Sequence, residues 1–116
     1  MERRFRLTST IEIQRVRRSG RSYADPLLVL VVQEGGKSNS RFAVTAGGSI
    51  GNAVKRNRAK RLIRAALKDL LAGIKPGYDG VIIARKPLIN SSSGETSLAL
   101  QSLLEKAGVI NSKTDG

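Results

Sequence analysis

The segment spanning residues 51–71 constrains the fold more than any other part of the chain, because it carries a long helical repeat. At about 100° per residue, four apolar side chains fall on one line along such a helix: Ala59, Ile63, Ala66 and Leu70. Four polar side chains follow the same spacing on roughly the opposite side: Asn57, Arg61, Arg64 and Lys68. The pattern predicts a long helix that packs through one face and leaves a basic face in solvent.

The basic face has no acidic residue to neutralise it before Asp69. Cations one helical turn apart repel one another by a few tenths of a kcal/mol per pair, and a bound polyanion would reverse that effect. The whole chain is basic as well, with 21 Lys and Arg against 9 Asp and Glu and a formal net charge of +12. We therefore interpret the helix as a nucleic-acid-binding element in preference to an ordinary solvated helix.

The composition excludes several kinds of active site. The chain contains no Cys and no His, so it lacks disulfides, thiolate zinc sites and the commonest general base. Asp25, Asp69 and Asp79 are far apart in the sequence, and each is expected in a turn, helix or loop and not at a metal. We therefore expect no catalytic side chain and no cofactor in the protein.

No segment is a candidate for a membrane helix. The longest apolar run, residues 27–32, is too short to cross a bilayer, and no signal-peptide pattern precedes it. The sequence thus predicts a cytoplasmic protein without a membrane partner, and it indicates no obligate protein partner.

The remaining sequence predicts five shorter elements around the long helix. They are a helix over residues 10–18, strands over 27–32, 41–46 and 81–84, and a last helix that ends near residue 107. The second strand is expected to return antiparallel beside the first. The order α-β-β-α-β-α predicts an α/β fold of the α+β sandwich type, in which helices cover a small sheet. Residues 1–108 are expected to form a single RNA-binding domain, and residues 109–116 a disordered tail.

Short sequence patterns predict the ends of the two flanking helices. Ser9 with Glu12, and Ser92 with Glu95, have the spacing of a capping box, in which each side chain accepts a backbone N–H. Gly20 is expected to end the first helix in a left-handed conformation, and Gly108 is expected to close the last one.

The basic segment also resembles a known motif. Its residues, in chain order, are Gly51-Asn52-Ala53-Val54, Arg56-Asn57-Arg58, Lys60-Arg61 and Arg64. This pattern resembles the RNR signature helix of the bacterial ribonuclease P protein component family. Tyr78-Asp79, the apolar strand after it and Arg85-Lys86-Pro87 are similar to the family strand that follows the helix. The resemblance covers nearly the whole chain.

The resemblance implies a fold and a division of labour. In this family the β-α-β crossover through the signature helix is left-handed, an exception to the usual hand. The family protein binds a large catalytic RNA, and the resulting ribonucleoprotein is an endoribonuclease that removes the 5′ leader from precursor tRNA. The resemblance further implies that the hydrolysis belongs to the RNA and its bound Mg²⁺, and that the protein is accessory.

Two sets of site residues follow from the pattern and the resemblance. The set expected to contact the catalytic RNA is Arg56, Asn57, Arg58, Lys60, Arg61, Arg64 and Lys68. The set expected in the family's leader-binding cleft over the sheet is Ile13, Arg17, Tyr23, Val31, Phe42 and Arg85. The family usually has aromatic residues at the positions of Ile13, Arg17 and Val31, so we expect weaker base stacking in this cleft. Phe42 is expected more in the core than in the cleft, because it opens a buried strand.

Three alternatives to a ribonuclease P subunit remain open at the level of sequence. A structural RNA-binding protein of ribosomal type would explain the charge and the basic helix equally well. A reader of the DNA major groove would also use a long basic helix. A nuclease acting alone is disfavoured, because the side chains that usually perform hydrolysis are missing.

Overall fold

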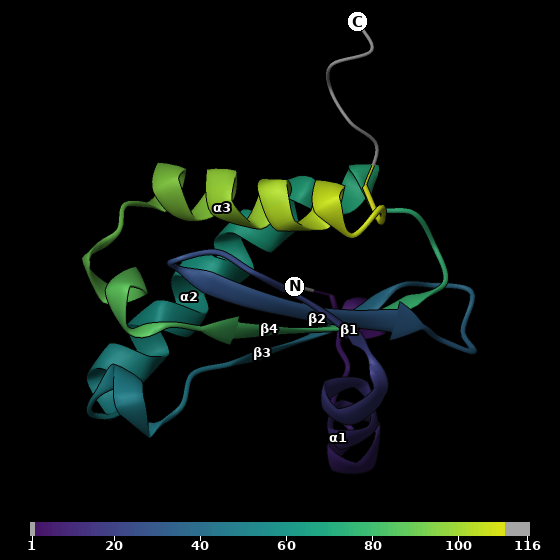
Figure 1. The fold of residues 1–116 in the computed structure, drawn as a ribbon, viewed down its shortest axis with the longest axis horizontal. Helices are drawn as coiled ribbons and strands as arrows, with labels where there is room; N and C mark the ends of the chain where they lie inside the picture. The colour runs from purple at the N-terminus through teal and green to yellow at the C-terminus, as the bar shows by residue number, and fades with distance from the viewer. Residues whose placement is uncertain (1, 111–116) are drawn as a thin grey trace, which may run out of the picture.

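The computed structural model describes residues 2–110, which form three α-helices and one four-stranded sheet (Figure 1). The helices are α1 (Thr10–Ser19), α2 (Ala53–Leu70) and α3 (Ser93–Lys106). The strands are β1 (Arg21–Ala24), β2 (Leu28–Glu34), β3 (Arg41–Thr45) and β4 (Tyr78–Ala84). Short 3₁₀ turns are η1 (Arg3–Phe5), η2 (Gly48–Ile50), η3 (Leu71–Gly73) and η4 (Lys86–Asn90). The predicted α+β architecture is confirmed, with one strand more than expected.

The strand order in the sheet is β1-β2-β4-β3, and it corrects two sequence-based expectations. The edge strand β1 was not predicted, because its four residues are mostly polar and exposed. β3 does not pair with β2, because β4 lies between them, antiparallel to β2 and parallel to β3. β4 carries apolar side chains on both faces, and a central position in the sheet covers both of them.

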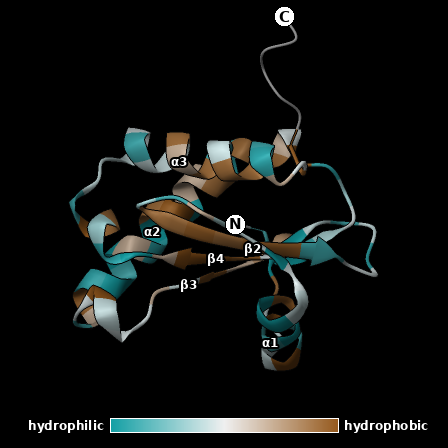
Figure 2. Ribbon diagram, in the orientation of Figure 1, coloured by the Kyte–Doolittle hydropathy of each residue, from teal (hydrophilic) through white to brown (hydrophobic). Residues whose placement is uncertain are grey.

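The helices divide unequally between the two faces of the sheet. α2 connects the parallel neighbours β3 and β4, so it is the crossover of a β-α-β unit. α2 and α3 pack against the same face of the sheet, whereas α1 lies on the opposite face (Figure 1). The middle strands β2 and β4 are strongly hydrophobic, whereas the helices have mixed surfaces (Figure 2).

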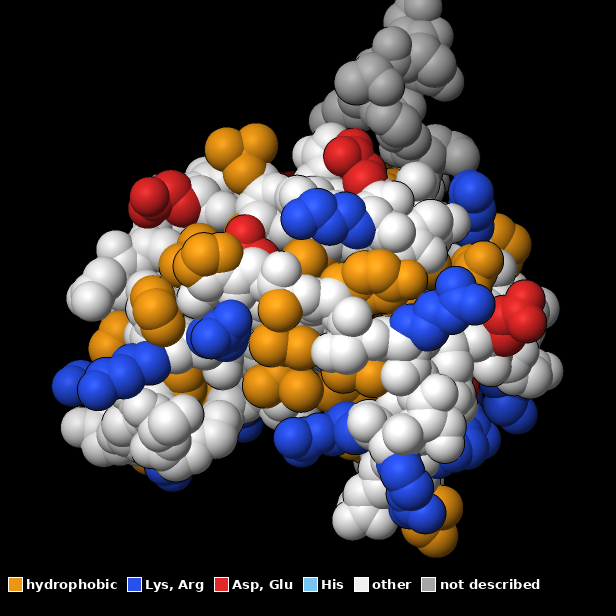
Figure 3. All heavy atoms as spheres, in the orientation of Figure 1, with side chains coloured by type: hydrophobic (Ala, Val, Ile, Leu, Met, Phe, Trp, Pro, Cys, Tyr) orange, Lys and Arg blue, Asp and Glu red, His pale blue; other side chains and the backbone are white. Residues whose placement is uncertain are grey.

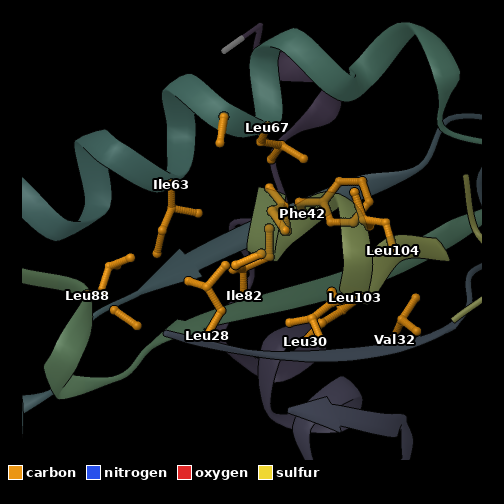
Figure 4. Close-up of a cluster of buried hydrophobic side chains, with 14 of the residues drawn as sticks. Leu28, Leu30, Val32, Phe42, Ile63, Leu67, Ile82, Leu88, Leu103 and Leu104 are labelled. Carbon is orange, nitrogen blue, oxygen red and sulfur yellow. The ribbon is translucent and has the colours of Figure 1, made fainter. Parts of the chain in front are cut away.

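The main core lies between the sheet and the helix pair α2 and α3. Ile63 and Leu67 of α2 point toward Phe42 and Ile82 of the sheet, and Leu104 of α3 meets them from the side (Figure 4). All five side chains are essentially inaccessible to solvent. At about 25 cal/mol per Å² of apolar area, such burial is the main favourable contribution to folding of this domain.

The helix ends agree only in part with the predicted caps. The Ser92 and Glu95 box of α3 is complete, with N···O distances of 3.1 and 2.8 Å. At α1 only half of the box forms: Ser9 Oγ accepts the Glu12 N–H at 3.3 Å, but the Glu12 carboxylate turns to Arg41 of β3. Gly20 is extended, with φ −76°, and not left-handed. A Cβ at Gly20 would lie 2.7 Å from the Val16 carbonyl oxygen, so space and not backbone conformation requires glycine there.

The C-terminal boundary of the domain lies further along the chain than predicted. Gly108 closes α3 with φ +75°, as expected. Val109 and Ile110, which were expected in the tail, are instead buried in the main core. The Val109 carbonyl accepts the Lys75 N–H at 2.8 Å, which fixes this segment beside η3. The remaining residues of the expected tail, 111–116, lie outside the described residues.

Candidate RNA-binding surface

The entry to α2 is built by three consecutive features of the sequence. Gly51 has φ +130°, a conformation that other residues adopt only with strain. Asn52 is the N-cap, and its Oδ1 accepts the Lys55 N–H at 3.0 Å. The Arg56 guanidinium turns back and donates to the Gly51 carbonyl oxygen at 2.9 Å. Arg56 therefore holds the entry turn with one N–H and keeps its other donors available for a ligand.

The two faces of α2 have the burial predicted from the sequence. Ala59, Ile63 and Ala66 are buried, together with Leu67, which the predicted apolar line did not include, and Leu70 is half-buried. The residues of the opposite side are exposed: Asn57, Arg58, Arg61, Arg64 and Lys68. Lys60 is half-buried at the boundary between the faces. One helix thus joins an apolar docking surface to a basic solvent surface.

The cations of α2 have no acidic partners in the part of the chain that the structure describes. The four ion pairs within residues 2–110 all involve residues of the N-terminal half and β4, and no Lys or Arg of α2 is among them. We call the exposed and boundary residues Asn57, Arg58, Lys60, Arg61, Arg64 and Lys68 the basic face of α2. Because its charges are unneutralised and accessible, this face is suited to bind a polyanion.

Basic side chains are also spread over the rest of the molecule. In the space-filling view, Lys and Arg outnumber Asp and Glu on the visible face, and several of them lie around α1 at the lower edge (Figure 3). The positive charge is therefore not confined to α2. What distinguishes the basic face of α2 is its regular spacing on one rigid helix.

The residues predicted for the leader-binding cleft fall on two different faces of the sheet. Ile13 and Val31 belong to a small apolar cluster on the α1 side, and Arg17 is exposed on α1. Phe42 is buried in the main core, on the other face. Tyr23 is the cross-strand partner of Leu30, so it also faces the main core. Tyr23 therefore does not share a surface with Ile13, whereas the burial of the Phe42 ring agrees with the expectation that it lies more in the core than in the cleft.

The last residue of the predicted cleft set, Arg85, is exposed directly after β4. Its guanidinium donates to the Asp25 carbonyl oxygen at 3.2 Å, so it links the end of β4 to the β1–β2 turn. Beside it, the α1 side of the sheet is only partly covered, because Val29 and Ile83 pack against the small cluster but remain half-exposed. We call the partly accessible sheet surface around Val29 and Ile83 the open strip.

A shallow hollow of about 190 Å³ joins the basic face of α2 to the α1 side of the sheet. Arg64 lines it from α2, Ile13 from α1, and Arg6, Thr8 and Thr45 supply further polar groups. Sequence reasoning did not single out Arg6 or Thr45, because their proximity to Arg64 depends on the tertiary fold. The two predicted binding areas are consequently neighbours and not separate sites.

An ion-pair network holds α1 on this face of the sheet. Arg41 of β3 donates to Glu12 of α1 at 2.8 Å and to Asp79 of β4 at 3.1 and 3.2 Å. Arg15 of α1 donates to the same Asp79 carboxylate at 3.0 Å. Asp79 is fully buried in strand β4. The sequence had led us to expect it in a turn, helix or loop. Sequence reasoning also missed the partnership of Arg41 and Asp79, which the β3–β4 register places opposite one another.

The network changes the proton affinity of two of its members. The hydrogen bonds from Arg41 hold the pKa of the Glu12 carboxyl below its usual value. The bonds to Glu12 and Asp79 raise the pKa of Arg41 above its ordinary value. Both groups are therefore charged at neutral pH, and the link between α1 and the sheet is an ionic one.

Within residues 2–110 the structure contains no group of three or more carboxylates that could hold a metal ion. The helices of the same region include none with the length and apolar character that a bilayer crossing requires. The basic face of α2 and the neighbouring shallow hollow present guanidinium, ammonium, amide and hydroxyl groups, which bind phosphates and bases.

The sequence of the chain is similar to a known protein family. The sequence profile described as Ribonuclease P matches residues 1–108. The "Ribonuclease P protein component" of Oceanobacillus iheyensis is 39% identical over 111 residues, covering 95% of this chain and 92% of the relative. The corresponding protein of Roseiflexus castenholzii is 37% identical over 111 residues, with 95% and 91% covered.

The fold is shared with solved structures as well. The RNase P protein of Staphylococcus aureus superposes with a TM-score of 0.83 at 28% identity, covering 92% of this chain and 98% of that one. The RNase P protein of Thermotoga maritima gives a TM-score of 0.78 at 25% identity, with 87% and 96% covered. From the match over residues 1–108 and these full-length similarities, we conclude that the chain belongs to the ribonuclease P protein component family.

Proposed function

We propose that this chain binds the RNA subunit of ribonuclease P through the basic face of α2, with Arg56 supporting the entry turn. The observation that carries the proposal is the separation of apolar and basic side chains on opposite faces of α2. Its buried face fixes the helix on the sheet, while its opposite face carries cations that no carboxylate neutralises within the described residues. Each phosphate that such cations contact contributes roughly 0.9 to the salt slope on a B-form duplex, or about 0.7 on single strands.

We further propose that the 5′ leader of precursor tRNA lies on the α1 side of the sheet. Ile13 and Arg17 of α1, Val31 of β2 and Arg85 after β4 border the open strip there. The shallow hollow with Arg6 and Arg64 would let one RNA strand pass from this strip to the basic face. The side chains of Tyr23 and Phe42 are not part of this proposal, because both pack on the main-core face of the sheet, although Phe42 also borders the shallow hollow.

In this proposal the RNA subunit performs the hydrolysis, with Mg²⁺ bound by the RNA. The protein residues on these surfaces neutralise phosphates and orient strands, which supports an accessory role in the cytoplasmic ribonucleoprotein. Arg and Asn suit this role, because a guanidinium bridges two phosphate oxygens and an amide both donates and accepts. The absence of His and Cys from the chain agrees with this division of labour.

The test is cleavage of precursor tRNA by the catalytic RNA at low magnesium, with and without this protein. We expect strong stimulation, because the protein supplies charge neutralisation that magnesium otherwise provides. Replacing Arg61 and Arg64 together by Ala should lose most of the stimulation. The matched control replaces Lys75 and Lys106, two exposed cations outside α2, and should retain it. Absence of stimulation by the unaltered protein would contradict the proposal.

A further inference from the structure

Phe5 is an aromatic residue that the fold leaves outside the core. It ends the turn η1, which is anchored by the next residues: Leu7 is buried, and its N–H donates to the Phe42 carbonyl oxygen at 2.9 Å. Phe5 itself is half-buried and belongs to neither apolar cluster of the described residues. The fold thus holds the backbone of this segment firmly while the ring faces a surface hollow.

That hollow, of about 600 Å³, lies between η1 and the C-terminal end of α2. Phe5, Leu71 and Ala72 form its apolar walls, and Lys68 and Glu2 supply its polar groups. Lys68 is the last residue of the basic face of α2, so the hollow is continuous with the surface proposed to bind RNA. A ligand here would meet an aromatic ring and an ammonium group together.

A cationic side chain, Arg4, lies against the Phe5 ring. The Arg4 guanidinium carbon lies 4.7 Å from the centroid of Phe5, within the range of a cation–π contact. Arg4 is exposed, and its only carboxylate partner in the described residues is the equally exposed Glu2, at 3.5 Å. Phosphates on either side of a base stacked on Phe5 would therefore find Lys68 and Arg4 as partners.

We propose that this hollow binds one unpaired nucleobase of an RNA strand that runs along the basic face of α2 and leaves it at Lys68. An apolar wall with an aromatic ring suits the flat face of a base, and flanking cations suit its phosphates. This inference depends on the proposed function, because it assumes that the protein binds RNA. The hollow lies at the opposite end of α2 from the entry turn. It adds a contact with bases to a surface that otherwise presents charge.

The first experiment uses the substitution Phe5→Trp, because the chain has no other Trp. A short oligoadenylate should quench the indole fluorescence on binding. A strand of the same length and charge without bases should bind more weakly and leave the fluorescence unchanged. The proposal of a base site would be overturned if both strands bound equally and changed the fluorescence equally, or if oligoadenylate bound without quenching. This assay needs no ribonuclease P RNA, so its failure is distinct from failure of the proposed function.

The second experiment measures affinity for the ribonuclease P RNA. Phe5→Leu keeps an apolar side chain but removes the ring, and it should weaken binding about 5- to 10-fold, the low end for loss of base stacking, without changing the salt slope. Phe5→Tyr should restore the affinity, and Leu98→Ala, which removes an exposed apolar side chain from α3, should have no effect. Wild-type affinity of the Phe5→Leu protein, with an unchanged melting temperature, would overturn the proposal.

Discussion

The two faces of the sheet are covered by helices that are held in place by different interactions. On the α2 and α3 side, eighteen buried residues of the described region form one apolar cluster that includes most of the largest fully buried side chains. On the α1 side the buried cluster has five members, namely Leu7, Val16, Val31, Ala43 and Val81, and an ion-pair network supplements it. The difference indicates that one face supplies most of the apolar stabilisation, while the other positions α1 beside the surface proposed to bind the leader.

This comparison also explains why the candidate binding residues lie where they do. The basic face of α2 is the outer surface of the stabilising layer, so its geometry is fixed by the main core. α1 depends on Val16 and on charged contacts, which leaves its outer residues free of packing constraints. The following changes test the comparison, beginning with the largest expected effect.

Truncation of the main core should cost the most stability. Ile63→Ala removes a fully buried side chain beneath α2, so we expect a loss of about 2–5 kcal/mol in the free energy of unfolding, measured with urea. Ile13→Ala, on the half-buried side of α1, should cost about 1 kcal/mol because less apolar area is lost. Equal losses from the two substitutions would break the distinction between the faces.

Removal of the buried charge at the centre of the network should cost less. Asp79→Asn preserves the shape of the side chain but weakens its bonds to Arg15 and Arg41, and we expect a loss of about 1–3 kcal/mol. Both arginines retain an alternative, since Arg41 still pairs with Glu12 and Arg15 is half-exposed. Asp69→Asn, at an exposed position of α2, is the control and should stay within about 0.5 kcal/mol.

The ionic link of α1 should make its contribution depend on pH. The pKa of Glu12 is lowered in the folded protein, so its stabilising effect is complete above the usual glutamate value of 4.5 and is lost as the pH falls through the folded pKa. The stability difference between the wild type and Glu12→Gln should therefore be largest near neutral pH and should vanish in acid. A difference that stays constant down to low pH would show that the carboxylate charge is unimportant.

The sequence alone predicted α2 and its two faces, because a period of 3.6 residues is a local property that needs no knowledge of neighbours. The exposure of Asn57, Arg61 and Arg64 and the burial of Ile63 agree with that prediction. The end of α3 at Gly108 was likewise predictable from a single residue with a local conformational preference.

Features that depend on strand pairing could not be predicted in the same way. Tyr23 was assigned to the wrong face, because the face of a strand residue follows from register and a shift of one residue reverses it. The central place of β4, the contact of Arg41 with Asp79, and the burial of Ile110 each require segments far apart in sequence to meet. The amino-acid composition of these segments does not indicate which of them pack together.

The central claim is that the basic face of α2 binds RNA, while its opposite face packs on the sheet and stabilises the fold. Its most direct test is the salt dependence of binding to the ribonuclease P RNA for Arg61→Ala combined with Arg64→Ala. We predict weaker binding, a slope of log affinity against log salt reduced by about 1.4–1.8, and stability within about 0.5 kcal/mol of the wild type. An unchanged slope in a folded double variant would contradict the account.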